Sequence, residues 1–290
     1  MDPRAGAILD PGRVIGRASG ENFPVASRVL PAGLRAPLMA IYGFARMVDD
    51  IGDEAPADRA ALLDRVSAEL DSIYSGSDEG TLHPLMRRVA QTVRAFSLPR
   101  EPFDQLIEAN RRDQVVSRYG TFDDLLGYCE LSANPVGHLV LAVLGMATPR
   151  RLEWSDAICS GLQLAEHWQD VAEDARRGRV YLPAEDLRRF DVAVEDIESG
   201  RPTPAFRRLM AFECARARGF LNRGLPLAKD LGGRPGFAIA AYVAGGRAAL
   251  QAIASADHDV LSSTPRASSA RRSIALVGTL VDSRRRGARP

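Results

Sequence analysis

The apolar positions of this chain recur with the period of an α-helix. Leu38, Ile41, Tyr42, Ala45 and Val48, for example, fall at i, i+3, i+4, i+7 and i+10, so they share one helical face. No segment alternates apolar and polar residues over a strand length beside a hairpin turn, so a β-sheet is not expected. The pattern predicts helices at about residues 37–50, 57–75, 84–97, 100–118, 121–132, 135–147, 153–176, 204–228, 234–256 and 266–284.

Turn-forming segments separate these helices, among them "SGSDEGTLHP" (75–84), "RRGRVYLP" (176–183) and "GGRPG" (232–236). The hydrophobic content of 46% is ample for a core. We therefore expect one all-α domain spanning residues 1–290, with flexible ends at residues 1–19 and 284–290.

Charge and cysteine content exclude several classes of function. With 38 basic and 37 acidic side chains, the net charge of +1 gives no general attraction to nucleic acid, so no nucleic-acid partner is expected. Cys129, Cys159 and Cys214 are widely spaced and form no CxxC pair, which argues for a reducing compartment. The N-terminus lacks the basic start and apolar core of a signal peptide, and the apolar run 136–147 is too short to span a bilayer. These features predict a cytoplasmic protein without a transmembrane helix.

Two acidic motifs are costly for helix stability and therefore indicate function. Glu166, Asp170 and Asp174 stand four residues apart, on one helical face, where like charges destabilise a helix by a few tenths of a kcal/mol per pair. Asp49 and Asp53 are also four residues apart, at the C-terminal end of their helix, where the carbonyl groups already carry negative partial charge.

Helices bearing these motifs, if they faced one another, would offer carboxylates to Mg²⁺, which typically bridges one or two carboxylates to substrate phosphates. Arg46 precedes the first motif, and Arg176, Arg177 and Arg179 follow the second, where arginines could contact phosphate oxygens. The alternative is a pair of solvated helix faces with salt bridges, such as Asp170 with Arg177. Two such motifs on long apolar helices favour the metal site.

Other chemistries have little support in the sequence. It contains no GxGxxG, P-loop or GxSxG motif. The four histidines are scattered without metal-ligand spacing, and we expect His167 to pack or cap. We expect Cys129 to be a buried small hydrophobic residue.

Three segments resemble, in order and spacing, the squalene/phytoene synthase family of head-to-head isoprenoid synthases. They are "AIYGFARMVDDIGDE", "YCELSANPVG" and "LQLAEHWQDVAEDARRGRVYLP", and the resemblance extends over roughly residues 20–280. It implies a single-domain isoprenoid (terpenoid) synthase fold with a central apolar cavity. It also implies that both acidic motifs bind Mg²⁺ and the diphosphate of an isoprenoid substrate.

The resemblance also implies roles for individual residues. Asp49, Asp53, Asp170 and Asp174 would be the metal-binding and catalytic carboxylates, and Tyr128 would face the carbocation. The substrate-binding residues would be Tyr42, Arg46, Ala133, Asn134, Val136, Gly137, Gln163, Glu166 and Arg179.

The N-terminal region departs from members that condense two prenyl diphosphates. Those members usually have serine and basic residues before a phenylalanine, whereas this chain has Gly20, Glu21 and Asn22 before Phe23. Glu21 would be a poor neighbour for a second diphosphate. "ENFPVAS" and "ANPVG" are similar to the hydroxysqualene synthase (HpnC) branch of the hopanoid pathway, which converts presqualene diphosphate to hydroxysqualene. Water would end that reaction, held by Tyr128, Asn134 or Glu166.

Three alternatives remain open. The chain could condense two farnesyl or geranylgeranyl diphosphates, or it could be a catalytically silent scaffold for neighbouring squalene-pathway enzymes. A general all-α interaction protein is the third. The basic C-terminus, with Arg284, Arg285, Arg286 and Arg289, suggests peripheral contact with the inner face of the membrane, against the alternative of a solvated tail.

Overall fold

The computed structural model describes residues 29–56, 58–77 and 83–286, without the side chains of residues 284–286. The described residues form helices and no strand, apart from one isolated parallel bridge between Arg118 and Val180. The all-α prediction is therefore confirmed. The expected flexible ends fall outside the described residues, except for residues 284–286 at the end of the last helix.

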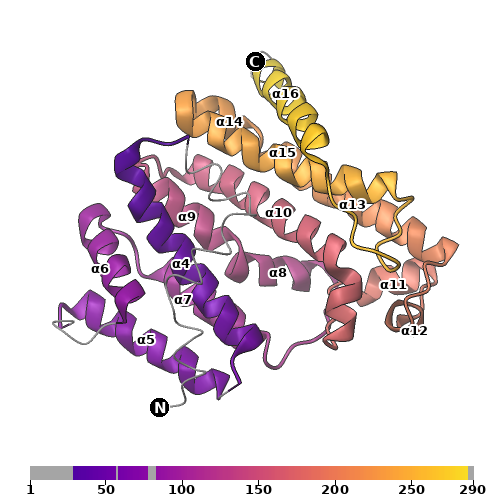
Figure 1. Ribbon diagram of the computed structural model, residues 1–290, viewed down its shortest axis with the longest axis horizontal. Helices are drawn as coiled ribbons and strands as arrows, with labels where there is room; N and C mark the ends of the chain where they lie inside the picture. Colours follow the sequence, from indigo (N-terminus) through magenta and orange to yellow (C-terminus); the bar gives the residue numbers. More distant parts are fainter. Residues whose placement is uncertain (1–28, 57, 78–82, 287–290) are drawn as a thin grey trace. The chain divides into compact units, whose positions relative to one another are not determined.

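The chain divides into two compact units, and the prediction of a single domain remains a prediction. The first unit comprises residues up to Val115 together with Leu131–Leu152, and the second comprises Val116–Glu130 together with residues from Glu153 onward. In the first unit, the central helix α4 (Ala32–Glu54) packs against the other four helices (Figure 1). Those helices are α5 (Arg59–Ser75), α6 (Pro84–Phe96), α7 (Glu101–Arg112) and α9 (Asn134–Val143).

The composition of α4 explains its central position. Its middle residues, from Ala40 to Phe44, are all buried, as expected for a helix that is covered on every side. A Cβ atom at Gly43 would meet Leu85 of α6 at 2.7 Å, so glycine permits the close approach of these two helices. The ring of Phe44 meets that of Phe103 on α7 edge to face, with centroids 4.9 Å apart.

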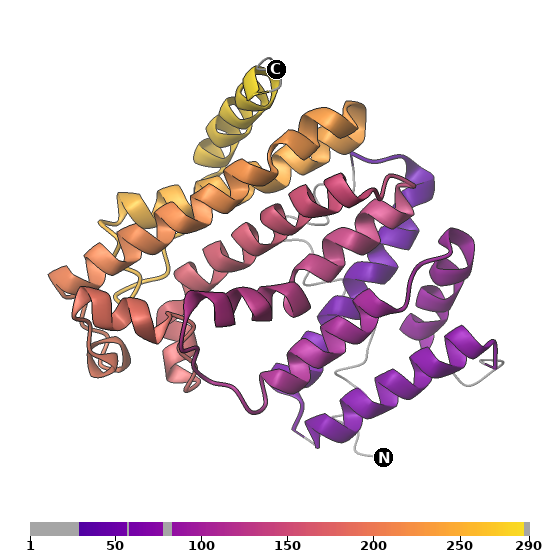
Figure 2. The ribbon, with the colours of Figure 1, turned by 180° about the vertical axis from the view of Figure 1, so that it is seen from behind.

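In the second unit, α15 is packed against α13, α14 and α16, an arrangement that Figures 1 and 2 show from opposite sides. Small residues allow close packing here: a Cβ at Gly224 would collide with α10 at Ile158, and one at Gly246 would meet Leu162 at 2.8 Å. The helices of this part of the chain are α8 (Phe122–Ser132), α10 (Pro149–Arg176), α11 (Ala184–Phe190), α12 (Val194–Glu198), α13 (Pro204–Gly224), α14 (Pro226–Leu231), α15 (Gly233–Ser255) and α16 (Ser269–Arg286).

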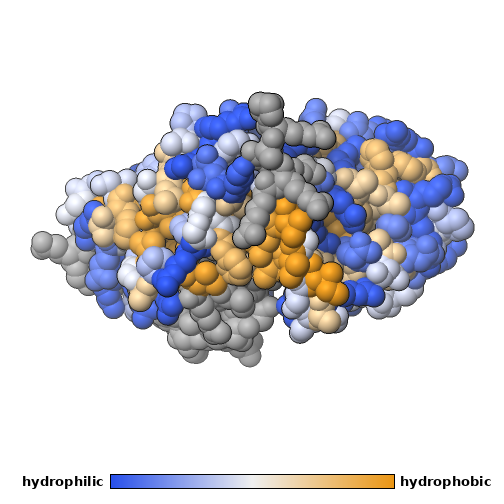
Figure 3. Space-filling model, turned by 90° about the horizontal axis from the view of Figure 1, so that it is seen from above, coloured by the Kyte–Doolittle hydropathy of each residue, from blue (hydrophilic) through white to orange (hydrophobic). Residues whose placement is uncertain are grey.

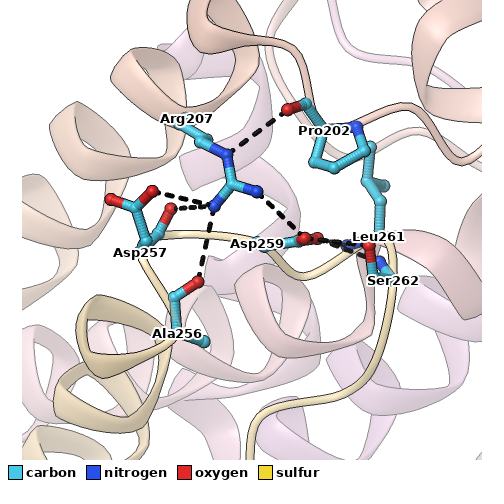
Figure 4. Close-up of polar contacts among 7 residues, drawn as sticks. All are labelled: Pro202, Arg207, Ala256, Asp257, Asp259, Leu261 and Ser262. Carbon is cyan, nitrogen blue, oxygen red and sulfur yellow. Dashed lines mark hydrogen bonds and ion pairs between the residues drawn. The ribbon is translucent and has the colours of Figure 1, made fainter.

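Arg207 joins the start of α13 to the loop that follows α15 (Figure 4). Its guanidinium forms ion pairs of 3.1 Å with Asp257 and with Asp259, and it also donates to the carbonyl oxygen of Pro202 at 3.3 Å. Asp259 in turn accepts from the backbone N–H groups of Leu261 and Ser262. One side chain thus fixes the loop that leads toward α16.

Several predicted boundaries were wrong. The helix expected at 100–118 ends at Arg112, and the one expected at 204–228 is divided at Leu225. The short helices α11 and α12 were not predicted, because five to seven residues are too few to display a helical period. Proline begins α10 at Pro149, inside a segment read as a break, since its missing N–H is not needed in the first turn.

Cys129 is buried, as predicted, and Cys129, Cys159 and Cys214 are free, while the reducing compartment stays a prediction. Among the described residues, α15 is the one helix long and apolar enough to cross a membrane by length and composition. In its most apolar window, 56% of the residues are buried in the protein, which is the pattern of a core helix.

Glu213 on α13 is an unusual member of the core because its carboxyl group is fully buried. Arg216 donates to this carboxyl group at 3.2 Å and to Asp186 at 2.8 Å. The Arg216 guanidinium also lies over the ring of Phe122, 3.9 Å from its centroid. Burial raises the pKa of Glu213 to about 8; the charge of Arg216 opposes this shift, and that of Asp186 adds to it.

Glu213→Gln should make stability less dependent on pH. The folded chain keeps the Glu213 proton up to about pH 8, whereas an unfolded glutamate releases it near pH 4.5. The wild-type free energy of unfolding therefore falls as the pH rises between these values. The variant should lose less stability over this range, by a few kcal/mol at most, as measured by urea unfolding at a series of pH values. Parallel profiles for the two proteins would show that Glu213 is already ionised in the folded state.

Candidate active site

The first acidic motif occupies the last turns of α4. Met47, Val48 and Ile51 are buried against the neighbouring helices, which leaves Asp49 and Asp53 exposed to solvent. Asp50, between these two aspartates, is buried and forms an ion pair with Arg46, whose Nε atom lies 3.1 Å from Asp50 Oδ1. Arg46, predicted to bind substrate, thus forms an ion pair within its own helix.

Asn110 on α7 orients Asp49. Its side-chain amide donates to Asp49 Oδ1 at 3.1 Å and to the carbonyl oxygen of Leu106, also at 3.1 Å. One turn later, Gln114 donates to the carbonyl oxygens of Gly52 (3.1 Å) and Asn110 (2.9 Å). A Cβ atom at Gly52 would collide with the Asn110 side chain, so glycine makes room for this contact. The side-chain amides of Asn110 on α7 and of Gln114 just after this helix therefore fix the end of α4 and its first aspartate.

The environment of Asp49 disfavours its charge. The pKa of Asp49 is raised to about 7, mainly because protein atoms crowd around the carboxyl group, even though part of it contacts solvent. The Asn110 hydrogen bond and the Arg46 charge lower the pKa, while Asp53 and Asp50 raise it. A bound cation near Asp49 would relieve the same unfavourable interactions.

The remaining predicted site residues of the first unit lie at two places. Tyr42 is buried two turns before Asp49 on α4. The others surround the start of α9, which packs against both α4 and α7. They are Ala133 at the N-cap, the buried Asn134, and the half-buried Val136 and Gly137.

The second acidic motif lies on α10, where the predicted stack of carboxylates is present. Glu166 is exposed, whereas Asp170 and Asp174 are half-buried. Arg177 pairs with Glu173 at 2.9 Å, not with Asp170 as the salt-bridge alternative suggested. Burial raises the pKa of Asp170, and it raises that of Asp174 to about 7 with a further contribution from Asp170.

The segment after α10 places Arg179 close behind this motif. Gly178 adopts a positive φ of 78°, which ends the helix, and the backbone N–H of Arg179 donates to the carbonyl oxygen of Asp174 at 2.9 Å. The next residues run beside the segment before α8: Val180 donates to Ser117 and Ala184 to Tyr119, each at 2.9 Å. The charge of Arg179 lowers the pKa of Asp174.

A cluster of aromatic rings, Tyr119, Tyr128, Tyr181 and His167, lies beside the second motif. His167 stacks on Tyr181 with ring centroids 3.8 Å apart, and both rings lie within 6.0 Å of Tyr128. All four residues are buried. Gln163, one turn before His167 on α10, lies 3.3 Å from its Nε2 atom. Burial, helped by the charge of Arg179, lowers the pKa of His167 to about 3, so the imidazole is neutral.

The sequence singled out both acidic motifs, Tyr128 and Gln163 as candidate site residues, but it did not single out Asn110, His167 or Tyr119, which contact them. Asn110 had a signal, because it follows Phe103 and Leu106 on the buried face of α7, where a polar residue needs a partner. His167 was expected to pack, and this is confirmed, but its stacking on Tyr181 had no signal. Tyr119 had no signal either, because it lies between the helices predicted at 100–118 and 121–132.

The aspartate pairs have the chemistry of magnesium ligands. Carboxylate oxygens are the ligands that Mg²⁺ prefers, and this ion usually takes only one or two from the protein, with water and phosphate completing its shell. In the part of the chain that the structure describes, no group of three or more His, Cys, Asp and Glu side chains could hold a metal ion. Asp49 with Asp53, and Asp170 with Asp174, each place two aspartates one helical turn apart, and Mg²⁺ binding by these pairs stays a prediction.

The chain is similar in sequence to known proteins. Residues 17–273 match the family model described as squalene/phytoene synthase. The chain is 36% identical over 215 residues to hydroxysqualene synthase from Rhodopseudomonas palustris, covering 73% of this chain and 71% of that protein. It is 34% identical over 215 residues to phytoene synthase from Arthrospira platensis, covering 69% of each.

A solved structure is also similar. The crystal structure of squalene synthase HpnC from Alicyclobacillus acidocaldarius superposes with a TM-score of 0.80 and 39% sequence identity. The match covers 87% of this chain and 95% of that one. It confirms the predicted isoprenoid synthase fold, while the apolar cavity remains a prediction.

Gly52→Ala should destabilise the protein, although alanine usually favours a helix over glycine by about 1 kcal/mol. The added Cβ would collide with the side chain of Asn110, which is buried and hydrogen-bonded. We expect the free energy of unfolding to fall by roughly 1–3 kcal/mol. The displaced amide would also release Asp49, so a carboxyl NMR titration should find the pKa of Asp49 raised further above about 7.

Gly127→Ala on α8 is the matched control, because no neighbouring atom lies within 4 Å of a Cβ at that position. This variant should be neutral or slightly stabilised. If Gly52→Ala behaved like Gly127→Ala and left the pKa of Asp49 unchanged, Asn110 would not be the group that positions Asp49.

Proposed function

This chain belongs to the squalene/phytoene synthase family, and from that premise we propose that it converts presqualene diphosphate and water to hydroxysqualene and diphosphate. The proposal includes a requirement for Mg²⁺. The observation that carries the enzymatic assignment is the presence of both acidic motifs, with Asp49 oriented by Asn110 and Asp174 followed by Arg179. A scaffold protein would have no use for partly buried carboxylates with raised pKa values.

The carboxylates and arginines would act on the leaving group. Asp49, Asp53, Asp170 and Asp174 would hold Mg²⁺, and the bound ion would neutralise negative charge that develops on the departing diphosphate. Arg179 is half-buried beside Asp174 and would contact the diphosphate oxygens directly. Arg177 is engaged with Glu173, so we assign it a weaker part in binding.

The aromatic cluster would protect the carbocation. When the carbon–oxygen bond breaks, the diphosphate keeps the electron pair and a cyclopropylcarbinyl cation remains, which must rearrange before water adds. Tyr128 and Tyr181 present aromatic faces, which attract a cation through their ring quadrupoles. His167 is neutral, so it adds a polarisable ring without adding repulsive charge.

Water would end the reaction by adding its oxygen to the rearranged cation and releasing a proton. Of the three groups suggested by sequence, Tyr128 is buried in the aromatic cluster, Asn134 is buried at the start of α9, and Glu166 is exposed. Of these three, Tyr128 lies beside the neutral His167. The side-chain nitrogen of Gln163 lies 3.3 Å from Nε2 of the same histidine. We therefore propose that Tyr128, together with Gln163 and His167, positions the water.

The alternative function is condensation of two prenyl diphosphates to presqualene diphosphate, squalene or phytoene. The 34% identity to a phytoene synthase favours it, and the acidic motifs fit it equally well. Two observations favour the hydroxysqualene reaction: the likeness to squalene synthase HpnC over 87% of this chain, and the residues Gly20, Glu21 and Asn22, which lie outside the described part of the chain. We also propose a cytoplasmic enzyme coupled to neighbouring squalene-pathway enzymes, because its C30 product is insoluble in water.

Chelation by EDTA should abolish turnover, and added Mg²⁺ should restore it. Asp49→Ala and Asp170→Ala should each lower kcat by at least about 100-fold, the scale of losing a preorganised group that stabilises developing charge. Product formation is measured by chromatography, and circular dichroism verifies that each variant is folded. Asp123→Ala, which removes an exposed carboxylate on α8, should retain full activity. Normal turnover in either folded motif variant would exclude the proposed metal site.

The wild-type protein should form hydroxysqualene from presqualene diphosphate without NADPH, because water and not hydride ends the reaction. It should not condense farnesyl diphosphate at a useful rate, since Glu21 would repel a second diphosphate. Mass spectrometry of the products from each substrate tests both statements. Replacing Gly20, Glu21 and Asn22 by Ser, Arg and Ser should strengthen farnesyl diphosphate binding. Rapid formation of presqualene diphosphate by the wild-type chain would instead support the condensing enzyme.

A further inference from the structure

The helix α16 carries an exposed apolar stripe. Of the five large hydrophobic side chains that are exposed in the described part of the chain, three lie on this helix: Ile274 (72% exposed), Val277 (64%) and Val281 (43%). They stand at i, i+3 and i+7, so they form one row along the helix. Figure 3 views the side of the molecule on which α16 lies, and hydrophobic surface is exposed there next to hydrophilic surface.

A groove of about 620 Å³ runs beside this stripe, between α16 and the helices α13 and α15. Ile274 contributes to both features, because it lines the groove as well as the stripe. The opposite wall, formed by α13 and α15, includes the polar side chains of Asn222 and Gln251 as well as Ala248. The groove therefore combines apolar surface with polar and charged side chains.

The charge of the groove is positive. Arg218, Arg247 and Arg271 line it, against the single carboxylate of Asp282. Arg247 is held by Asp282 at 2.9 Å and by Thr279 Oγ1 at 3.2 Å. Arg218 and Arg271 are exposed, and their guanidinium groups remain available for an anion from outside. The sequence continues with further arginines from Arg284 onward.

We propose that α16 docks this protein onto a membrane surface that contains anionic phospholipids. The stripe of Ile274, Val277 and Val281 enters the boundary between headgroups and acyl chains, as the apolar face of an interfacial helix does. Arg218 and Arg271 contact lipid phosphate groups at the mouth of the groove. This proposal does not depend on which isoprenoid diphosphate is the substrate.

Charge complementarity favours a membrane over a second copy of the chain. In a two-fold symmetric dimer built on this face, the same arginines of both copies would come together, which is unfavourable. A stripe of three aliphatic side chains is also small beside the roughly 800 Å² per partner that a stable interface usually buries. An anionic lipid surface satisfies the arginines and the apolar stripe together.

Vesicle co-sedimentation of the full chain tests the proposal. The wild-type protein should bind vesicles of phosphatidylcholine with phosphatidylglycerol, bind phosphatidylcholine alone much more weakly, and lose binding as salt is raised. Arg218→Glu with Arg271→Glu should weaken binding by at least about 30-fold, since each arginine near an anionic surface contributes roughly fivefold. Ile274→Asp with Val277→Asp should also abolish co-sedimentation.

Two matched variants control for charge and hydrophobicity. Arg88→Glu makes the same charge change on the exposed face of α6, and Val115→Asp removes the most exposed aliphatic residue outside α16. Both should bind vesicles as the wild type does. All variants should be folded by circular dichroism and should turn over detergent-dispersed substrate normally, which separates this test from that of the proposed function.

Three outcomes would overturn the proposal. They are absence of wild-type binding to the anionic vesicles, equal losses in the control variants, and unchanged binding in both double variants. Light scattering during gel filtration identifies the competing explanation: a wild-type dimer that Ile274→Asp with Val277→Asp converts to a monomer would make this face an interface between copies of the chain.

Discussion

Every feature of the candidate site depends on holding like charges in fixed positions on rigid helices. Carboxylates four residues apart repel one another, and a flexible segment would let them separate. Buried apolar side chains prevent this separation. At the end of α4 they are Met47, Val48 and Ile51. On α10, which carries the second motif, they are Leu164, Trp168 and Val171. The raised pKa values of Asp49 and Asp174 are the electrostatic consequence of that anchoring. A core that packs well thus maintains a site that is electrostatically unfavourable when no cation is bound.

The parts of the fold that sequence predicted are those governed by local periodicity. Helices α4, α5, α6, α8 and α15 were expected from the spacing of their apolar residues, and their centres are correct. One of the errors arose where a long-range contact decides the conformation. Residues 113–118 read as the continuation of α7, but Ser117 accepts a hydrogen bond from Val180, and Arg118 bridges to the same residue. That partner is more than sixty positions away, so no local pattern could reveal it.

The same distinction applies to the site: some of its residues could be recognised from the sequence, and others only from the folded structure. The aspartates were recognisable because they are unfavourable in their own helices, a property that sequence alone displays. Asn110 and His167 are favourable only in their tertiary context, where one orients Asp49 and the other stacks on Tyr181. Arg46, which the resemblance predicts to bind substrate, forms an ion pair with Asp50, and its contact with substrate stays a prediction. Resemblance to a family assigns positions, but the partners of each side chain come from the folded structure.

In the second unit, Arg179 carries a positive charge beside Asp174, whereas the aromatic cluster around His167 carries none. The proposed reaction explains this difference. Diphosphate departure requires positive charge, which Arg179 supplies beside Asp174. The cation left behind would be repelled by positive charge, so a protonated imidazole among the tyrosines would oppose its formation. Burial prevents that protonation by lowering the pKa of His167 to about 3, and Arg179 contributes to the same shift. One arginine thereby favours the leaving anion and keeps the neighbouring histidine neutral.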